Sequence, residues 1–109
     1  MVHYVVMPDA DCLVLLVQGH ASEYAEHNGK NIVCAAVSTI CDMAAAGCNS
    51  YDPYTTVTAD KGKFYLTCRK LSETMAILKS AKLELDRLKE NYPYCFGGET
   101  DVAKNNHSI

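Results

Sequence analysis

Two residues in the first third of the chain could carry out chemistry together. In the stretch "GHASEYAEHNGKNIVCAAVS", His20 stands just before a polar segment, and Cys34 lies at the start of an apolar one. An imidazole can take the proton of a thiol, and the thiolate can then attack a carbonyl carbon. The same pattern is also typical of a loop histidine and a core cysteine, so the elements around the two residues must decide between these readings.

The segment "NIVCAAVSTICDMAAAG" predicts a buried helix. We expect it to start near Asn31, whose side chain can cap the first N–H groups, and to stop at Gly47 as a left-handed cap. Cys34 would then lie in the first turn, where helices favour negative charge. The backbone N–H groups of Val33 and Cys34 could hold the oxyanion of an attacked carbonyl.

His20 follows the apolar run "CLVLLVQG", which predicts a strand. The end of a strand is a rigid place from which an imidazole can be aimed. Gly19 and Ala21 on either side are small enough to leave room for a substrate backbone. Taken alone, however, His20 is more typical of an ordinary surface or strand-end histidine than of a catalytic base.

Other residues near the pair have competing explanations. His27 is a rival base, but it lies in the predicted loop beside the Asn28-Gly29 turn signal. Ser38 is one turn after Cys34; it can bond back to its own helix or orient a group in a site. His3 and His107 are assigned to structure and to the tail.

The remaining segments define the expected fold. Two strands at 2–7 and 12–19 enclose a turn with Pro8, and the second is expected to be central and covered on both faces. The loop 20–30 leads to the helix, and another loop covers 48–54. A hairpin around Lys61-Gly62 precedes a second helix, for which Ser72 is the expected N-cap and Pro93 the end.

The order ββαββα predicts an α+β fold, with a mostly antiparallel four-stranded sheet packed by two helices. The apolar face of the second helix is expected to include Met75, Leu78, Ala81, Leu85, Leu88 and Tyr92. We expect one domain over 1–94 and a mobile tail over 95–109.

Composition narrows the function classes. The chain has 109 residues and a net charge of −3. This negative charge argues against non-specific binding to nucleic-acid phosphates. No run of about 18 uncharged apolar residues is present to cross a membrane, and no secretory signal is visible. We therefore expect a cytoplasmic protein with no membrane contact, whose six cysteines stay as thiols.

A metal site is not expected. Cys34, Cys41 and Cys48 are seven residues apart on one helical stripe, and seven residues of helix rise about 10.5 Å. That separation is too large for a shared metal ion or a disulfide. We expect no metal and no cofactor.

The pieces "GHA" and "NIVCAAVS" resemble the bacterial ribosomal-processing cysteine protease family, Prp, and the predicted order of elements is similar to its fold. The resemblance implies an endopeptidase that removes a short N-terminal extension from a large-subunit ribosomal protein. It assigns His20 as general base and acid and Cys34 as nucleophile. Gly19, Ala21 and Ser38 match motif positions without assigned roles.

The resemblance also implies a homodimer, and movement of the loop between histidine and cysteine on substrate binding, where Gly29 could act as a hinge. Two features differ from the family pattern. Asn31 stands where the family has an aspartate, and an amide cannot stabilise an imidazolium by charge. The loop between His20 and Cys34 is also slightly longer than usual.

Two other functions remain open from the sequence. One is a non-catalytic binding module of the same fold for a basic ribosomal protein. The other is a phage-type relative that matures a virion protein.

Overall fold

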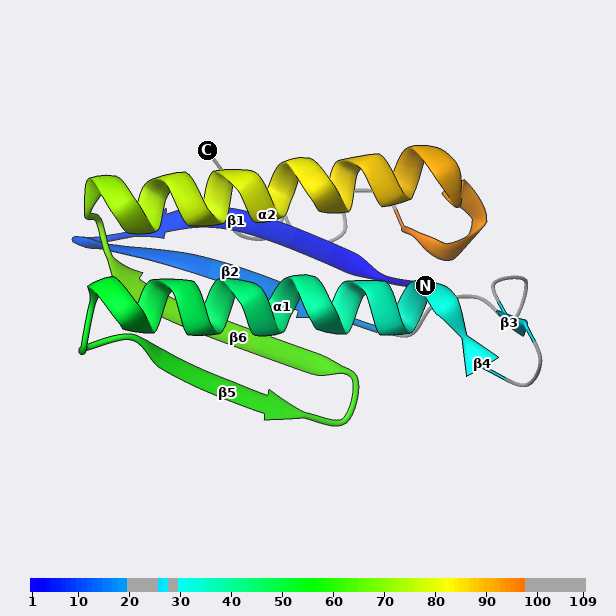
Figure 1. Cartoon of the computed structure of the whole chain (residues 1–109), viewed down its shortest axis with the longest axis horizontal. Helices are drawn as coiled ribbons and strands as arrows, with labels where there is room; N and C mark the ends of the chain where they lie inside the picture. The colour runs from blue at the N-terminus through cyan, green and yellow to red at the C-terminus, as the bar shows by residue number, and fades with distance from the viewer. Residues whose placement is uncertain (20–25, 28–29, 98–109) are drawn as a thin grey trace.

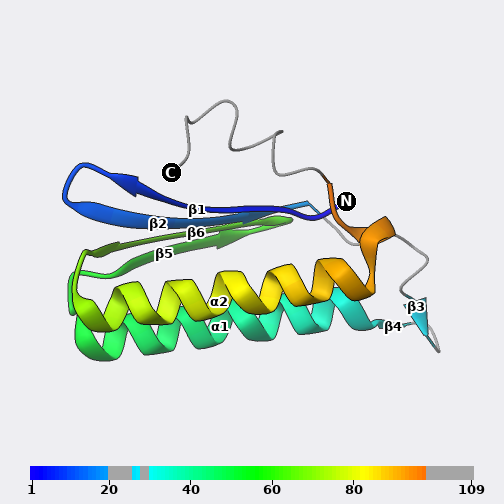
Figure 2. The ribbon, with the colours of Figure 1, turned by 90° about the horizontal axis from the view of Figure 1, so that it is seen from above.

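The computed structural model describes residues 1–19, 26–27 and 30–97. Two helices lie on one face of a four-stranded antiparallel sheet with the strand order β1-β2-β6-β5 (Figures 1 and 2). The helices are α1 (Ile32–Tyr51) and α2 (Ser72–Asn91). The sheet strands are β1 (His3–Asp9), β2 (Cys12–Gln18), β5 (Thr56–Asp60) and β6 (Lys63–Arg69). The predicted α+β fold with the order ββαββα is confirmed.

Part of the predicted loop before α1 has regular structure. The short strands β3 (Glu26–His27) and β4 (Lys30–Asn31) pair antiparallel and lead directly into α1. The expectation of a plain loop over 20–30 is therefore wrong for these residues. Likewise, Pro8 lies inside β1, where it pairs with Leu13, and not in the turn. A proline is tolerated there because β1 is an edge strand.

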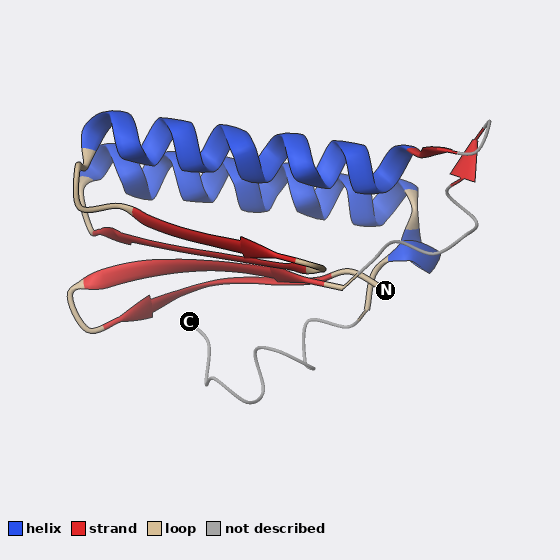
Figure 3. Ribbon diagram, turned by 90° about the horizontal axis from the view of Figure 1, so that it is seen from below, coloured by secondary structure: helices blue, strands red, loops and turns tan. Residues whose placement is uncertain are grey.

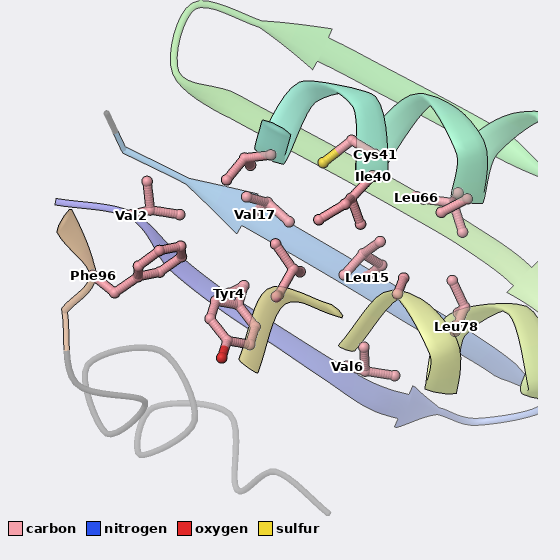
Figure 4. Close-up of a cluster of buried hydrophobic side chains, with 14 of the residues drawn as sticks. Val2, Tyr4, Val6, Leu15, Val17, Ile40, Cys41, Leu66, Leu78 and Phe96 are labelled. Atoms are coloured by element: carbon pink, nitrogen blue, oxygen red, sulfur yellow. The ribbon is translucent and has the colours of Figure 1, made fainter. Parts of the chain in front are cut away.

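The strand β2 lies between β1 and β6, as predicted. Alternate residues of a strand face opposite sides of the sheet, so Leu13, Leu15 and Val17 turn toward the helices. Figure 4 shows Leu15 and Val17 among the core side chains of both helices. On the face without helices, Val14 is nevertheless 0 % exposed.

The helix α1 supplies much of the core. Its buried residues are Val33, Val37, Ile40, Cys41, Ala44 and Cys48. With 20 residues and a mean hydropathy of 1.5, α1 is long and apolar enough to cross a membrane by length and composition. Its packing against α2 and the sheet (Figure 3) is instead that of the core helix of a globular domain.

Gly47 does not end the first helix. The helix α1 continues to Tyr51, so the predicted cap at Gly47 and the predicted loop at 48–51 are wrong. A Cβ added at Gly47 would lie 3.1 Å from Cδ1 of Ile77 on α2. The glycine therefore serves close packing of the two helices, which a sequence pattern cannot distinguish from a cap.

The second helix is capped differently from the prediction. Ser72 is its first helical residue, and the cap position is Leu71. The hydroxyl of Thr74 accepts a hydrogen bond from the N–H of Leu71 at 3.0 Å and donates one to the carbonyl of Arg69 at 2.6 Å. Met75 was expected on the apolar face of this helix but is 51 % exposed, and the preceding residue, Thr74, is buried instead.

The packed domain extends past the expected boundary at residue 94. A 3-10 helix covers Pro93–Cys95, and both Cys95 and Phe96 are buried. The N–H of Val2 donates to Cys95 at 2.8 Å, and the N–H of Gly97 donates to Val2 at 2.8 Å. The expected tail is therefore wrong for residues 95–97, and its remainder, 98–109, lies outside the described residues.

Asp52, just after α1, ties this helix to the sheet. Its side chain is 0 % exposed. One carboxylate oxygen accepts the backbone N–H of Arg69 at 2.7 Å; the other accepts Nε of Arg69 at 2.9 Å and the N–H of Tyr54 at 3.0 Å. These bonds, led by the Arg69 backbone N–H, lower the pKa of Asp52 below its usual 3.8.

Asp52→Asn is expected to lower the melting temperature by about 5 °C or more at pH 7, because an amide NH₂ would face an N–H donor. A lowered pKa stabilises the fold above pH 3.8, and this contribution disappears as the pH falls through the folded-state pKa. The deficit should therefore shrink at strongly acidic pH. Melting curves by circular dichroism test this, with the exposed Asp11→Asn as a matched control. Equal melting temperatures for the two variants at pH 7 would contradict the assignment.

Candidate active site

Cys34 is the third residue of α1, in the first turn of the helix. Its neighbours in the helix, Val33 and Val37, are buried, whereas Cys34 itself is half-buried. The first four N–H groups of an α-helix have no acceptor within the helix, and the helix dipole favours an anion beside them. The sequence-based placement of Cys34 in a first helical turn is therefore correct.

Cys34 opens into a cavity of about 280 Å³ between α1 and the β5–β6 hairpin. One wall follows α1 through Val37, Ser38, Cys41 and Asp42. The opposite wall is the end of the hairpin, over 59–64. Figures 1 and 2 show this turn beside the N-terminal half of α1.

The end of β2 closes the cavity through Val17 and Gly19. The N–H of Gly19 donates to the carbonyl of Gly62 in the hairpin turn at 2.7 Å. Gly19 has a φ of +95°, and a Cβ there would lie 1.9 Å from the carbonyl oxygen of Met1. The requirement for glycine is thus steric as well as conformational. This contact fixes the point from which the chain continues to residue 20.

The predicted site residues are only partly covered by the structure. Gly19, Cys34 and Ser38 line one cavity. Val33 does not line it, since its side chain is 1 % exposed in the core. His20, Ala21 and Gly29 lie outside the described residues, and so do the side chains of Asn31 and His27.

The hairpin wall was not assigned to the site from the sequence. The Lys61-Gly62 turn predicts a hairpin, and this hairpin is present. Its place opposite Cys34 depends on the crossover that sets β6 beside β2. No local pattern in the sequence encodes that neighbour.

The other described cysteines differ from Cys34 in their environment. Burial, followed by the charge of Asp42, raises the pKa of Cys41 to about 11. Burial and the neighbouring Cys68 raise the pKa of Cys48 to about 12, and burial also raises the pKa of Cys68. These buried thiols stay protonated near neutral pH. Cys34 and Cys12 are the half-buried thiols of the described part.

The described residues offer no place for a bound metal. Within 1–19, 26–27 and 30–97, no three His, Cys, Asp or Glu side chains lie close enough to hold a metal ion. What the cavity does offer is a thiol at a helix N-terminus beside a rigid strand end. This arrangement suits covalent catalysis by cysteine.

Comparison with known proteins identifies the class. The family model for the cysteine protease Prp matches residues 1–96. The chain therefore belongs to the cysteine protease Prp family, and it is a cysteine-type peptidase. A search of the curated proteins found no match.

Solved structures share the fold at low sequence identity. The ribosomal processing protease Prp from S. aureus with a covalently linked product peptide has 19 % identity and a TM-score of 0.73, covering 89 % of this chain and 96 % of that one. The same S. aureus protease with a substrate peptide has 16 % identity and a TM-score of 0.69 over the same shares. The protein SMU.848 from Streptococcus mutans has 22 % identity and a TM-score of 0.61, covering 89 % and 94 %.

Proposed function

We propose that Cys34 is the nucleophile of this peptidase and that His20 is its general base and acid. The observation that carries the proposal is that Gly19 and Cys34 line the same cavity. His20 follows Gly19 directly, and consecutive Cα atoms are about 3.8 Å apart. This adjacency in the sequence supports the choice of His20 as the partner of the Cys34 thiol.

The reaction would proceed through a thioester. His20 takes the proton of Cys34, and the thiolate attacks the scissile carbonyl carbon. The backbone N–H groups of Val33 and Cys34 hold the resulting oxyanion. The tetrahedral adduct collapses as the C–N bond breaks, and His20 gives its proton to the departing amine. Water, deprotonated by His20, then hydrolyses the thioester and regenerates the thiol.

Asn31 directly precedes α1, and in this proposal it can orient His20 only by hydrogen bonds. A carboxylate there would also stabilise the imidazolium by charge. The proposed pair therefore works without the charged partner that the family resemblance associates with this position.

The proposed substrate is a large-subunit ribosomal protein, from which the enzyme removes a short N-terminal extension. Two similar structures are ribosomal processing proteases from S. aureus, one of them with a substrate peptide, which supports this choice. The net charge of −3 suits a basic substrate. We further propose that the enzyme acts in the cytoplasm as a homodimer and does not bind nucleic acid or a membrane.

The test is mass spectrometry of an extended large-subunit ribosomal protein after incubation with the enzyme. We expect a single cut within the N-terminal extension. Brief iodoacetamide treatment at pH 7 should alkylate Cys34 and Cys12 but spare Cys41, since a pKa of about 11 leaves about one thiolate in 10⁴. The treated enzyme should not cut, and Cys12→Ala should cut like the wild type.

Binding of the ribosomal protein without any cut would favour the non-catalytic module. A cut only in a phage virion protein would replace the substrate and keep the chemistry. Full activity after complete alkylation of Cys34 would contradict the proposed nucleophile.

A further inference from the structure

A carboxylate lies along the same cavity wall as the thiol. Asp42 is two turns after Cys34 on α1, with Ser38 between them, and all three residues line the cavity. Eight residues of helix rise about 12 Å. Asp42 is exposed. It therefore presents a carboxylate on the wall of the cavity at a distance from the thiol of Cys34.

Two other charged residues line the cavity, and both belong to the hairpin. Asp60 and Lys63 are register partners across the hairpin. A carboxylate oxygen of Asp60 also accepts the N–H of Lys61 at 2.7 Å. None of the ion pairs found among the described residues includes Asp42, Asp60 or Lys63. With two aspartates and one lysine, the described lining carries one more negative than positive charge, and Asp42 supplies the negative charge on the helix side.

The lining near Asp42 also includes apolar side chains. Val17, Val37, Cys41 and Phe64 contribute to it. A peptide seated along this wall would place apolar side chains against these residues and a charged one beside Asp42. A carboxylate in a lining with a net negative charge favours a cation at that point.

We infer that Asp42 determines specificity by selecting a lysine or arginine three to five residues from the scissile bond. An extended peptide advances about 3.3 Å per residue, so 12 Å corresponds to about four residues. The inference rests on the proposed function, because the distance is counted from Cys34 as nucleophile. Asp42 does not touch the reacting atoms and acts only on substrate choice.

The expected size of the substrate preference follows from the solvent exposure of Asp42. An ion pair between solvent-exposed groups is worth a modest amount, which corresponds to about a two- to fivefold preference in kcat/KM. The preference should fall when the salt concentration is raised to about 0.5 M, because salt screens exposed charges. Charge reversal at Asp42 should invert the preference toward glutamate.

The experiment uses the full chain and a set of peptides based on the cleaved sequence. Each peptide carries one lysine, glutamate or glutamine at positions two to six on either side of the scissile bond. The enzymes are wild type, Asp42→Asn and Asp42→Lys. Asp11→Asn removes one exposed carboxylate at the far end of the sheet and serves as the matched control. The readout is kcat/KM, which compares substrates without any assumption about binding.

The inference predicts a lysine preference at one position in wild type and in Asp11→Asn, its loss in Asp42→Asn and its reversal in Asp42→Lys. Equal preferences in wild type and Asp42→Asn would overturn the inference and leave the proposed function intact, provided that the glutamine peptide is cut. No cleavage of any peptide, or cleavage by a Cys34→Ala variant, would overturn both.

Discussion

Replacing Cys34 by alanine is expected to lower kcat for peptide cleavage by about 10⁴-fold or more. The thioester route needs a nucleophile, and the loss of a catalytic nucleophile leaves only the help that binding and the oxyanion donors give. Cys34 is half-buried, so the change removes one sulfur atom at the cavity wall and should leave the melting temperature within a few degrees of wild type. Single-turnover cleavage followed by mass spectrometry measures the rate.

The same experiment tests whether His20 acts on Cys34. His20→Ala should also reduce kcat steeply, and the double variant should be no slower than Cys34→Ala, because residues that act as a unit are not additive. Cys48→Ala is the control on the same helical stripe; Cys48 does not line the cavity, so the variant should retain activity even if it loses stability. If the double variant instead lost kcat by the product of the two single-variant factors, His20 and Cys34 would not act as a catalytic pair.

Gly19→Ala is expected to cost both stability and activity. An alanine at a φ of +95° is strained, and its Cβ would lie 1.9 Å from the Met1 carbonyl oxygen. The segment around Met1 cannot simply move away, since Val2 is held by backbone hydrogen bonds to Cys95 and Gly97, which lie in a neighbouring segment of the same chain. We expect a loss of about 2 kcal/mol, or about 8 °C in melting temperature.

The loss of activity should exceed what this loss of stability explains. The N–H of Gly19 anchors the end of β2 to Gly62, and His20 is the next residue. A displacement of about 1 Å in a catalytic group can cost about 100-fold in rate. We therefore expect kcat to fall about 100-fold at temperatures where the variant is fully folded.

Gly47→Ala provides the matched control for Gly19→Ala. Its added Cβ would meet the flexible end of Ile77 at 3.1 Å, at a distance from the cavity. Its activity should equal that of wild type. If Gly19→Ala keeps full activity while folded, the strand end does not position the catalytic base.

Local patterns in the sequence are sufficient for the main elements and for the place of Cys34 in the first turn of a helix. Short apolar runs predict β1 and β2, and a long apolar segment predicts α1 with Cys34 in its first turn; the structure agrees. These features depend on neighbours one to four residues apart, so a single sequence contains them. The family resemblance of "GHA" and "NIVCAAVS" adds the roles of His20 and Cys34, which remain proposals.

Features that depend on distant contacts were decided only by the tertiary structure. The sequence predicts a helix cap at Gly47, whereas the structure shows that Gly47 allows close packing against α2. The sequence likewise predicts that Cys95 and Phe96 belong to the tail, whereas Phe96 pairs with Val2 in the folded chain. The hairpin wall opposite Cys34 and the approach of Met1 to Gly19 likewise join segments more than 15 residues apart. The sequence determined which residues can react, and the packing of distant segments decided what surrounds them. The reason is that a close approach between two distant backbone segments produces no periodic pattern of residue types that could be recognised in the sequence.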